Sequence, residues 1–129
     1  MYCLDTNIVV DILRGDSSLR SKLDEMSEIF DVFITSISLC ELYRGAYGHS
    51  NPEEKIKILE EFISNFDLLT LEKESCDEFG KVYKNLEKKG SVVKEFDLMI
   101  ACIVKTNDLV LVTRDKKHFV DTGIKIETW

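Results

Sequence analysis

Short apolar runs alternate along the chain with longer segments of helical periodicity, and this alternation constrains the fold more than any other feature. The runs cover residues 2–4, 31–35, 67–71, 109–113 and 124–129. Most segments between them carry apolar residues three or four positions apart, as amphipathic helices do. Parallel strands need a crossover connection, which is usually a helix. We therefore predict an α/β fold, a three-layer α/β/α sandwich with a mostly parallel central sheet of about five strands.

Nothing in the sequence divides the chain into parts. It contains no internal repeat, no linker and no low-complexity segment, and 129 residues suffice for one core. We therefore expect a single domain over residues 1–129. No apolar run approaches the roughly 20 residues that a membrane-spanning helix needs, and no signal-peptide pattern opens the chain. We expect a cytoplasmic protein that does not contact a membrane.

The net charge, the cysteines and the histidines exclude several classes of function. The formal net charge of −7 argues against binding nucleic acid by charge over the whole surface, but it is compatible with acids gathered in one cation site. The cysteines at 3, 40, 76 and 102 form no CxxC pair, and their apolar surroundings predict buried free thiols. His49 and His118 have no second histidine at metal-binding spacing, so a zinc site or a histidine-based triad is poorly supported.

Four acids occupy comparable places in the predicted topology. Asp5 follows the first strand, and Glu41 lies in the helix that opens after the second. Asp97 opens the helix before the strand at 109–113, and Asp115 lies just past that strand. Strand carboxyl ends and helix amino ends share one edge of a parallel sheet, so these acids can converge. Clustered carboxylates repel unless a cation compensates them, and Mg²⁺ or Mn²⁺ takes oxygen ligands. Two such ions about 4 Å apart can activate water for phosphodiester cleavage.

Each acid also has an ordinary structural interpretation. Asp5 can simply cap a helix, and Glu41 can complete an S-x-x-E capping box with Ser38. Asp97 is a favourable charge at a helix amino end, and Asp115 can start a turn. The joint placement at one edge favours a shared site. Asp97 in addition precedes seven consecutive apolar residues, where an acid without a partner is costly.

Four sequence blocks, LDTN, CELYRG, FDLMIA and TRDKKHF, resemble the signature blocks of the PIN-domain family, in the family's order and spacing. The chain is most similar to the VapC-type toxins of toxin–antitoxin pairs, and its ending GIKIETW resembles their closing strand. The resemblance spans nearly the whole chain. It implies an endoribonuclease that depends on Mg²⁺ or Mn²⁺, a cognate antitoxin that silences it, and homodimers.

Carried over by residue, the resemblance makes Asp5, Glu41, Asp97 and Asp115 the catalytic and metal-binding acids. Asn7 and Thr113 become polar groups that orient those acids or the attacking water. The chain departs from the family in its last block, where His118 replaces a frequent acid. The first acidic position of that block, often Asn in relatives, is Asp115 here, and it is taken as the fourth ligand.

Several alternatives stay open at this point. Arg44 and Arg114 can bind substrate phosphates, although a solvated surface explains most basic residues equally well. The face formed by Ile56, Leu59 and Ile63 can serve an interface or the core. A dehalogenase-type phosphatase would need an acid where Asn7 stands, and no glycine-rich phosphate loop is present. The main alternative is a non-catalytic PIN-fold module that binds protein or RNA.

Overall fold

The computed structural model describes residues 1–129 and has a five-stranded, entirely parallel sheet with the order β3-β2-β1-β4-β5. The strands are β1 (Tyr2–Leu4), β2 (Val32–Thr35), β3 (Asp67–Leu69), β4 (Val110–Val112) and β5 (Lys125–Glu127). The helices are α1 (Thr6–Leu13), α2 (Ser17–Ser27), α3 (Ser36–Tyr47), α4 (Pro52–Ile63), α5 (Lys73–Lys89), α6 (Glu95–Thr106) and α7 (Lys116–Phe119), with a 3-10 turn at Val120–Thr122.

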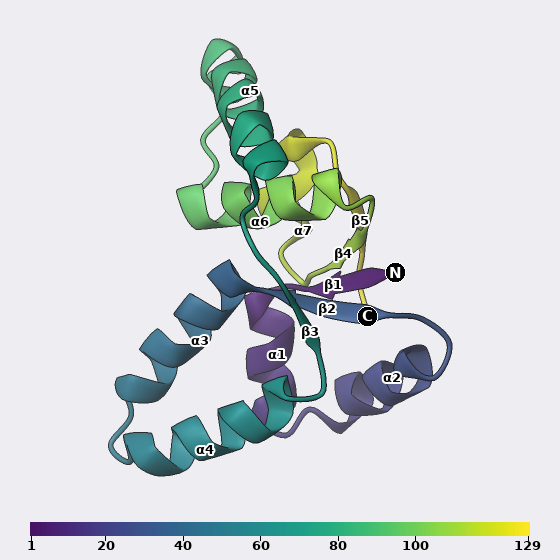
Figure 1. The fold of residues 1–129 in the computed structure, drawn as a ribbon, viewed down its shortest axis with the longest axis vertical. Helices are drawn as coiled ribbons and strands as arrows, with labels where there is room; N and C mark the ends of the chain where they lie inside the picture. Colours follow the sequence, from purple (N-terminus) through teal and green to yellow (C-terminus); the bar gives the residue numbers. More distant parts are fainter.

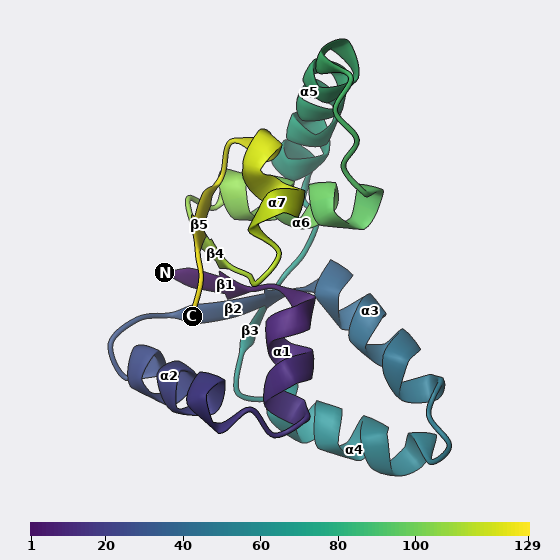
Figure 2. The ribbon, with the colours of Figure 1, turned by 180° about the vertical axis from the view of Figure 1, so that it is seen from behind.

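Helices α1–α4 lie on one side of the sheet, and α5–α7 lie on the other (Figures 1 and 2). The predicted three-layer α/β fold is therefore confirmed. None of these helices has the length and apolar character needed to cross a membrane.

The central strand β1 shows why the sheet is covered on both faces. Leu4 belongs to the core cluster under α1–α4, whereas its neighbour Cys3 packs in the cluster formed with α6. Both side chains are fully buried. Successive residues of a strand point to opposite faces, so a strand in which two neighbouring residues are apolar requires a helical layer on each side.

The apolar stripe of α4 belongs mainly to the core. Leu59 is buried in the cluster under α1–α4, and Ile56 and Ile63 pack against that cluster. The helix ends one residue before Ser64, whose side chain donates to the carbonyl of Glu61 at 2.7 Å. This face was predicted to serve either an interface or the core, and the structure shows that it packs in the core.

Three details differ from the sequence-based expectations. The expectation of four buried thiols is wrong for Cys40 and Cys76, which are exposed, and right for Cys3 and Cys102. Cys40 lies two residues from the buried Leu42, and positions two apart on a helix face opposite ways. Helix α6 begins at Glu95, two residues before the expected start, and β3 is shorter than the predicted run at 67–71.

Candidate functional site

Asp5 lies at the centre of the candidate site, directly after β1. Its backbone N–H donates to the carbonyl of Val112 at 2.9 Å, which ties it to the end of the adjacent strand β4. The residue is only 5% exposed. One oxygen accepts from the Thr6 N–H at 2.8 Å, and the other accepts from the Thr113 hydroxyl at 2.7 Å. The residue caps α1, as predicted, and also presents a fixed, buried acid at the carboxyl edge of the sheet.

The surroundings of Asp5 disfavour its negative charge. Burial raises the pKa of this carboxyl to about 6, and the hydrogen bonds from Thr113 and Thr6 oppose that rise. The negative charges of Asp97 and Glu41 raise the pKa further. Electrostatic influence of this kind requires proximity, so acids from three different parts of the chain lie near one another.

Glu41 is joined to Asp5 through Thr6. The Thr6 hydroxyl donates to Glu41 at 2.8 Å, while the Thr6 backbone N–H donates to Asp5. The alternative capping box of Ser38 with Glu41 is not formed, because α3 starts at Ser36 and the Thr35 hydroxyl accepts from the Ser38 N–H at 3.0 Å. The side chain of Glu41 is thus left for the site. Sequence reasoning missed the role of Thr6, although it stands inside the LDTN block.

Asp115 is fixed by Asn7 and Thr113. The Asn7 amide donates to the Asp115 carboxylate at 2.8 Å, and the Asp115 N–H donates to the Thr113 hydroxyl at 3.0 Å. The carbonyl oxygen of the Asn7 side chain is buried without a hydrogen-bond partner. Buried polar atoms are nearly always paired, so this oxygen is available to a water molecule or an ion.

Asp97 lies in the first turn of α6 and is about four-fifths buried, with a side-chain exposure of 17%. Burial raises its pKa, His118 lowers it, and the charges of Glu41 and Asp115 raise it again. The His118 Nδ1 lies 3.6 Å from the Asp97 carboxylate. The four acids predicted from the sequence therefore gather at one edge of the sheet.

The four carboxylates are the residues that could hold a divalent cation. They are hard oxygen donors whose mutual repulsion a cation would relieve. Burial is the main cause of the raised pKa values of Asp5 and Asp97, and the charges of the neighbouring acids add to it. No three acidic, histidine or cysteine side chains are drawn together as a preformed metal cage. This spacing is expected without a cation, because the negative charges repel one another. Asp5, Glu41 and Asp115 are in addition each held in place by a hydrogen-bond donor. The donor set, with the free Asn7 oxygen, fits a divalent ion.

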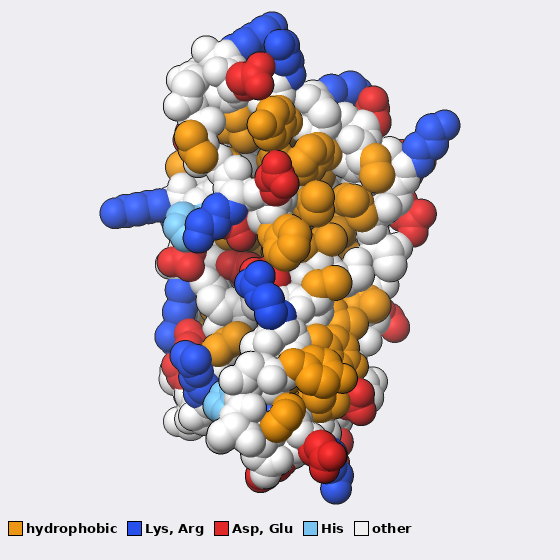
Figure 3. All heavy atoms as spheres, turned by 90° about the vertical axis from the view of Figure 1, so that its left-hand side faces the viewer, with side chains coloured by type: hydrophobic (Ala, Val, Ile, Leu, Met, Phe, Trp, Pro, Cys, Tyr) orange, Lys and Arg blue, Asp and Glu red, His pale blue; other side chains and the backbone are white.

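Arg44 and His118 are the basic side chains that lie within 4 Å of these acids. On the face shown in Figure 3, acidic side chains lie among Lys, Arg and His side chains and beside a broad hydrophobic area. Arg44 is 75% exposed, and its guanidinium lies 3.9 Å from Glu41, a position from which it could reach a bound phosphate. Arg114 is placed differently, because its guanidinium pairs with Asp11 and Asp16.

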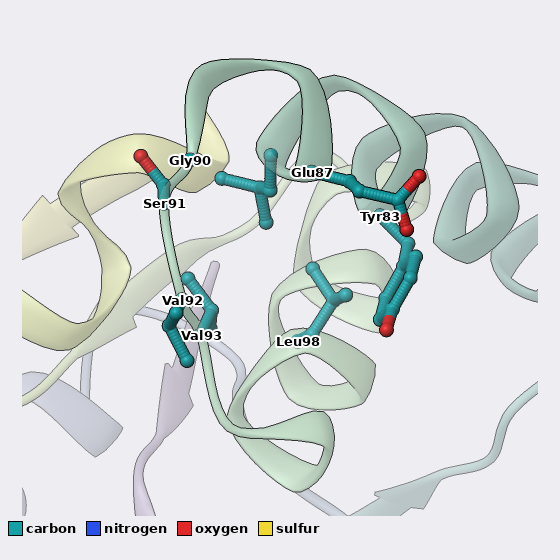
Figure 4. Close-up of a pocket in the computed structure, with 8 residues that line it drawn as sticks. Tyr83, Glu87, Gly90, Ser91, Val92, Val93 and Leu98 are labelled. Atoms are coloured by element: carbon teal, nitrogen blue, oxygen red, sulfur yellow. The ribbon is translucent and has the colours of Figure 1, made fainter.

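Two pockets open on the surface of the protein. A pocket of about 190 Å³ between α1, α3 and α4 includes Glu41, with Arg14, His49 and Lys55 among the residues that line it. A second pocket, of about 280 Å³, lies between the end of α5 and the start of α6 (Figure 4). Its lining residues are Tyr83, Leu86, Glu87, Gly90, Ser91, Val92, Val93 and Leu98. The second pocket contains none of the four acids, so of these two pockets only the first includes a residue of the candidate site.

The buried charge of Asp5 predicts an unusual effect of pH on the metal-free protein. The folded pKa of about 6 exceeds the ordinary 3.8, so the folded state holds this proton more tightly than the unfolded state. This tighter proton binding stabilises the folded state at low pH, and the stabilisation is lost as pH rises through 6. The loss amounts to about 1 kcal/mol of unfolding free energy between pH 5 and pH 7.5. Metal-free Asp5→Asn protein should therefore lose less unfolding free energy over this interval than the parent. Urea titrations at both pH values measure it, and equal losses in the two proteins would contradict the assignment.

Comparison with known proteins gives a consistent family assignment. The model of the PIN domain family matches residues 2–125. Ribonuclease VapC2 of Haemophilus influenzae is 29% identical over 130 residues, covering 99% of this chain and 97% of the relative. The tRNA(fMet)-specific endonuclease VapC of Salmonella typhimurium is 31% identical over 134 residues, with the same coverage of both chains.

Solved structures agree with these relatives. The crystal structure of VapBC2 from Rickettsia felis bound to a DNA fragment from its promoter superposes with a TM-score of 0.94 at 27% identity, covering 99% of this chain and 98% of the other. DNA-bound VapBC from Salmonella typhimurium gives a TM-score of 0.92 at 30% identity, covering 99% and 97%. The likeness extends over the whole fold, including the edge of the sheet where the acids lie.

Proposed function

The chain belongs to the PIN-domain family, as one of its VapC-type members, and from this premise we propose that it is an endoribonuclease that acts as the toxin of a type II toxin–antitoxin pair. The observation that carries the proposal is the convergence of Asp5, Glu41, Asp97 and Asp115 at one edge of the sheet. A non-catalytic binding module would have no chemical need for four acids in one place, one of them buried and two others half-buried.

We propose that these four carboxylates hold Mg²⁺ or Mn²⁺. Such an ion, when bound, lowers the pKa of water and neutralises charge on the phosphate and on the leaving oxygen. The polar neighbours keep the carboxylates aimed at the site. Thr113 and the Thr6 N–H fix both oxygens of Asp5, and the Thr6 hydroxyl fixes Glu41. Asn7 fixes Asp115, so little reorganisation is left for the moment of reaction.

The RNA backbone would approach from the rim of the site. Arg44 is the best placed side chain to contact a phosphate, because it is 75% exposed and lies beside Glu41. Contacts of this kind position the backbone but read no sequence. The net charge of −7 does not favour binding of RNA over the whole surface. Binding through a few basic side chains at the rim of the site agrees with that charge.

The proposed partners are RNA, a cognate antitoxin and a second copy of the chain. Related solved structures are VapBC complexes, in which a VapC chain is assembled with VapB. In this chain the pocket between α1, α3 and α4 joins apolar side chains to Arg14, Lys55 and Glu41. An antitoxin segment with apolar and acidic residues would complement that pocket and cover Glu41. The proposed place of action is the cytoplasm, where RNA and antitoxin are available.

Removing divalent metal tests the proposal directly. Purified protein should cleave RNA with Mg²⁺ or Mn²⁺, lose the activity in excess EDTA and regain it when metal is restored in excess. Asp5→Asn protein, prepared in parallel, reveals any contaminating nuclease. Sequencing the new RNA ends would identify the cut position. Cleavage that continues in EDTA, or binding of RNA with no cleavage under any metal condition, would reject the metal-dependent nuclease.

A further inference from the structure

The loop after β4 carries two groups of the proposed site on either side of Arg114. Thr113 donates to Asp5, and Asp115 accepts from Asn7. Both contacts join the loop to the start of α1, more than a hundred residues earlier in the sequence. The position of this loop against α1 therefore decides whether the carboxylates of Asp5 and Asp115 share one site.

Arg114 supplies a third attachment between the same two segments. One guanidinium nitrogen donates to Asp11 at 2.9 Å, and another donates to Asp16 at 2.7 Å. Asp11 lies in the last turns of α1, and Asp16 caps α2 by accepting from the Leu19 N–H. The pKa of Asp16 is held below its ordinary value by the Leu19 N–H and by Arg114. The loop is thus held at both ends of α1 by side chains on three successive residues.

We propose that Arg114 is a positioning residue of the nuclease site: by pairing with Asp11 and Asp16 it holds Thr113 and Asp115 where they can orient Asp5 and complete the metal-binding set. This inference rests on the proposed function. A displacement of about 1 Å in a catalytic group can cost about a hundredfold in rate, so a clamp that touches neither substrate nor metal can still limit turnover.

The surroundings of Arg114 argue against a direct contact with substrate phosphate. Two carboxylates face its single guanidinium, so the cluster carries excess negative charge and would repel a phosphate. Both terminal nitrogens are already engaged. Arg44 differs in each respect, because it is more exposed and its one acidic neighbour lies at 3.9 Å.

Kinetics of Arg114→Ala test the assignment. We expect kcat to fall roughly 10- to 100-fold while KM for RNA changes less than about twofold, because ground-state binding is untouched. Arg114→Lys should recover part of the rate by pairing with one acid. Asp11→Asn should lower kcat in the same way, and the double variant with Arg114→Ala should be no slower than the Ala variant alone. Lys125→Ala, which removes an exposed 2.9 Å pair with Asp108, is the matched control and should behave as the parent.

A measurement without turnover separates positioning from general stability. Mn²⁺ should raise the melting temperature of Arg114→Ala less than that of the parent, whereas Lys125→Ala should show the full shift. Exposed ion pairs contribute little to stability, so the metal-free melting temperatures should stay close together. If Arg114→Ala fails to fold, Arg114→Lys and Asp11→Asn carry the same comparison.

Three results are informative in different ways. Parent-like kcat and a full Mn²⁺ shift in Arg114→Ala would overturn the inference. A raised KM with an unchanged kcat and a weaker salt dependence would also overturn it, in favour of a phosphate contact. Equal cleavage by the parent and by Asp5→Asn would instead defeat the proposed function, and the Mn²⁺ shifts would still decide whether Arg114 positions a cation site.

Discussion

Asp97→Asn is expected to lower kcat/KM for RNA cleavage by about a thousandfold or more and to leave the protein folded. The substitution keeps the size of a side chain that is 17% exposed in the first turn of α6. It removes one of the four proposed ligand charges, and metal-assisted hydrolysis depends on that charge to hold the ion. It also relieves the repulsion that raises the pKa of Asp5, so the metal-free variant should melt no lower than the parent.

Glu95→Gln provides a matched control for Asp97→Asn. Glu95 occupies the same first turn of α6 and is exposed. The change removes the same charge from the same helix end, which costs only the small favourable interaction with the helix dipole. Glu95→Gln should therefore cleave RNA within about twofold of the parent. If the kcat/KM of Asp97→Asn stays within about tenfold of the parent value, Asp97 is not one of the catalytic residues.

Mn²⁺ or Mg²⁺ is expected to stabilise the folded protein strongly at pH 7.5 and weakly at pH 5. Binding to the folded state alone adds about 2.7 kcal/mol when the free metal is a hundredfold above Kd. The pKa of Asp5 is about 6, so at pH 5 this carboxyl is mostly protonated and must release its proton before it can bind metal. Thermal melts with and without metal at both pH values measure the difference.

Two results would contradict this linkage. Equal stabilisation at pH 5 and pH 7.5 would mean that metal binds without Asp5. No stabilisation at millimolar metal at pH 7.5 would favour a non-catalytic PIN-fold module. Asp5→Asn tests the mechanism in the same melts, because it should reduce the shift at pH 7.5 and remove most of its dependence on pH.

The fold was predictable because its signals are local. Residues 2–4 have little polar character, which indicates a buried strand at β1. The helical periodicity of the segments between the strands indicates crossover helices, and therefore a parallel sheet. The place of Asp5 follows from the same signals, since it is the first residue after β1. The sequence also groups the four acids, because strand ends and helix starts share one edge of a parallel sheet.

The contacts that organise the site could not be predicted, because they join distant parts of the chain. Arg114 pairs with acids 98 and 103 residues away, and nothing in the TRDKKHF block itself indicates those partners. The start of α3 was ambiguous for a different reason. Thr35, Ser36 and Ser38 can all cap a helix, and only the observed start at Ser36 shows that Glu41 is free of a capping box. His118 remains a neighbour of Asp97 whose role the sequence left open.

Direct titration with Mn²⁺ tests most sharply whether the four carboxylates form one cation site. Free Mn²⁺ can be followed by electron paramagnetic resonance in the parent, Asp5→Asn, Glu41→Gln, Asp97→Asn, Asp115→Asn and the Glu95→Gln control at pH 7.5. We predict that each of the four site variants binds Mn²⁺ at least about tenfold more weakly than the parent, while Glu95→Gln binds it as the parent does. Parent-like Mn²⁺ affinity in all four site variants would contradict the shared site and the nuclease mechanism built on it.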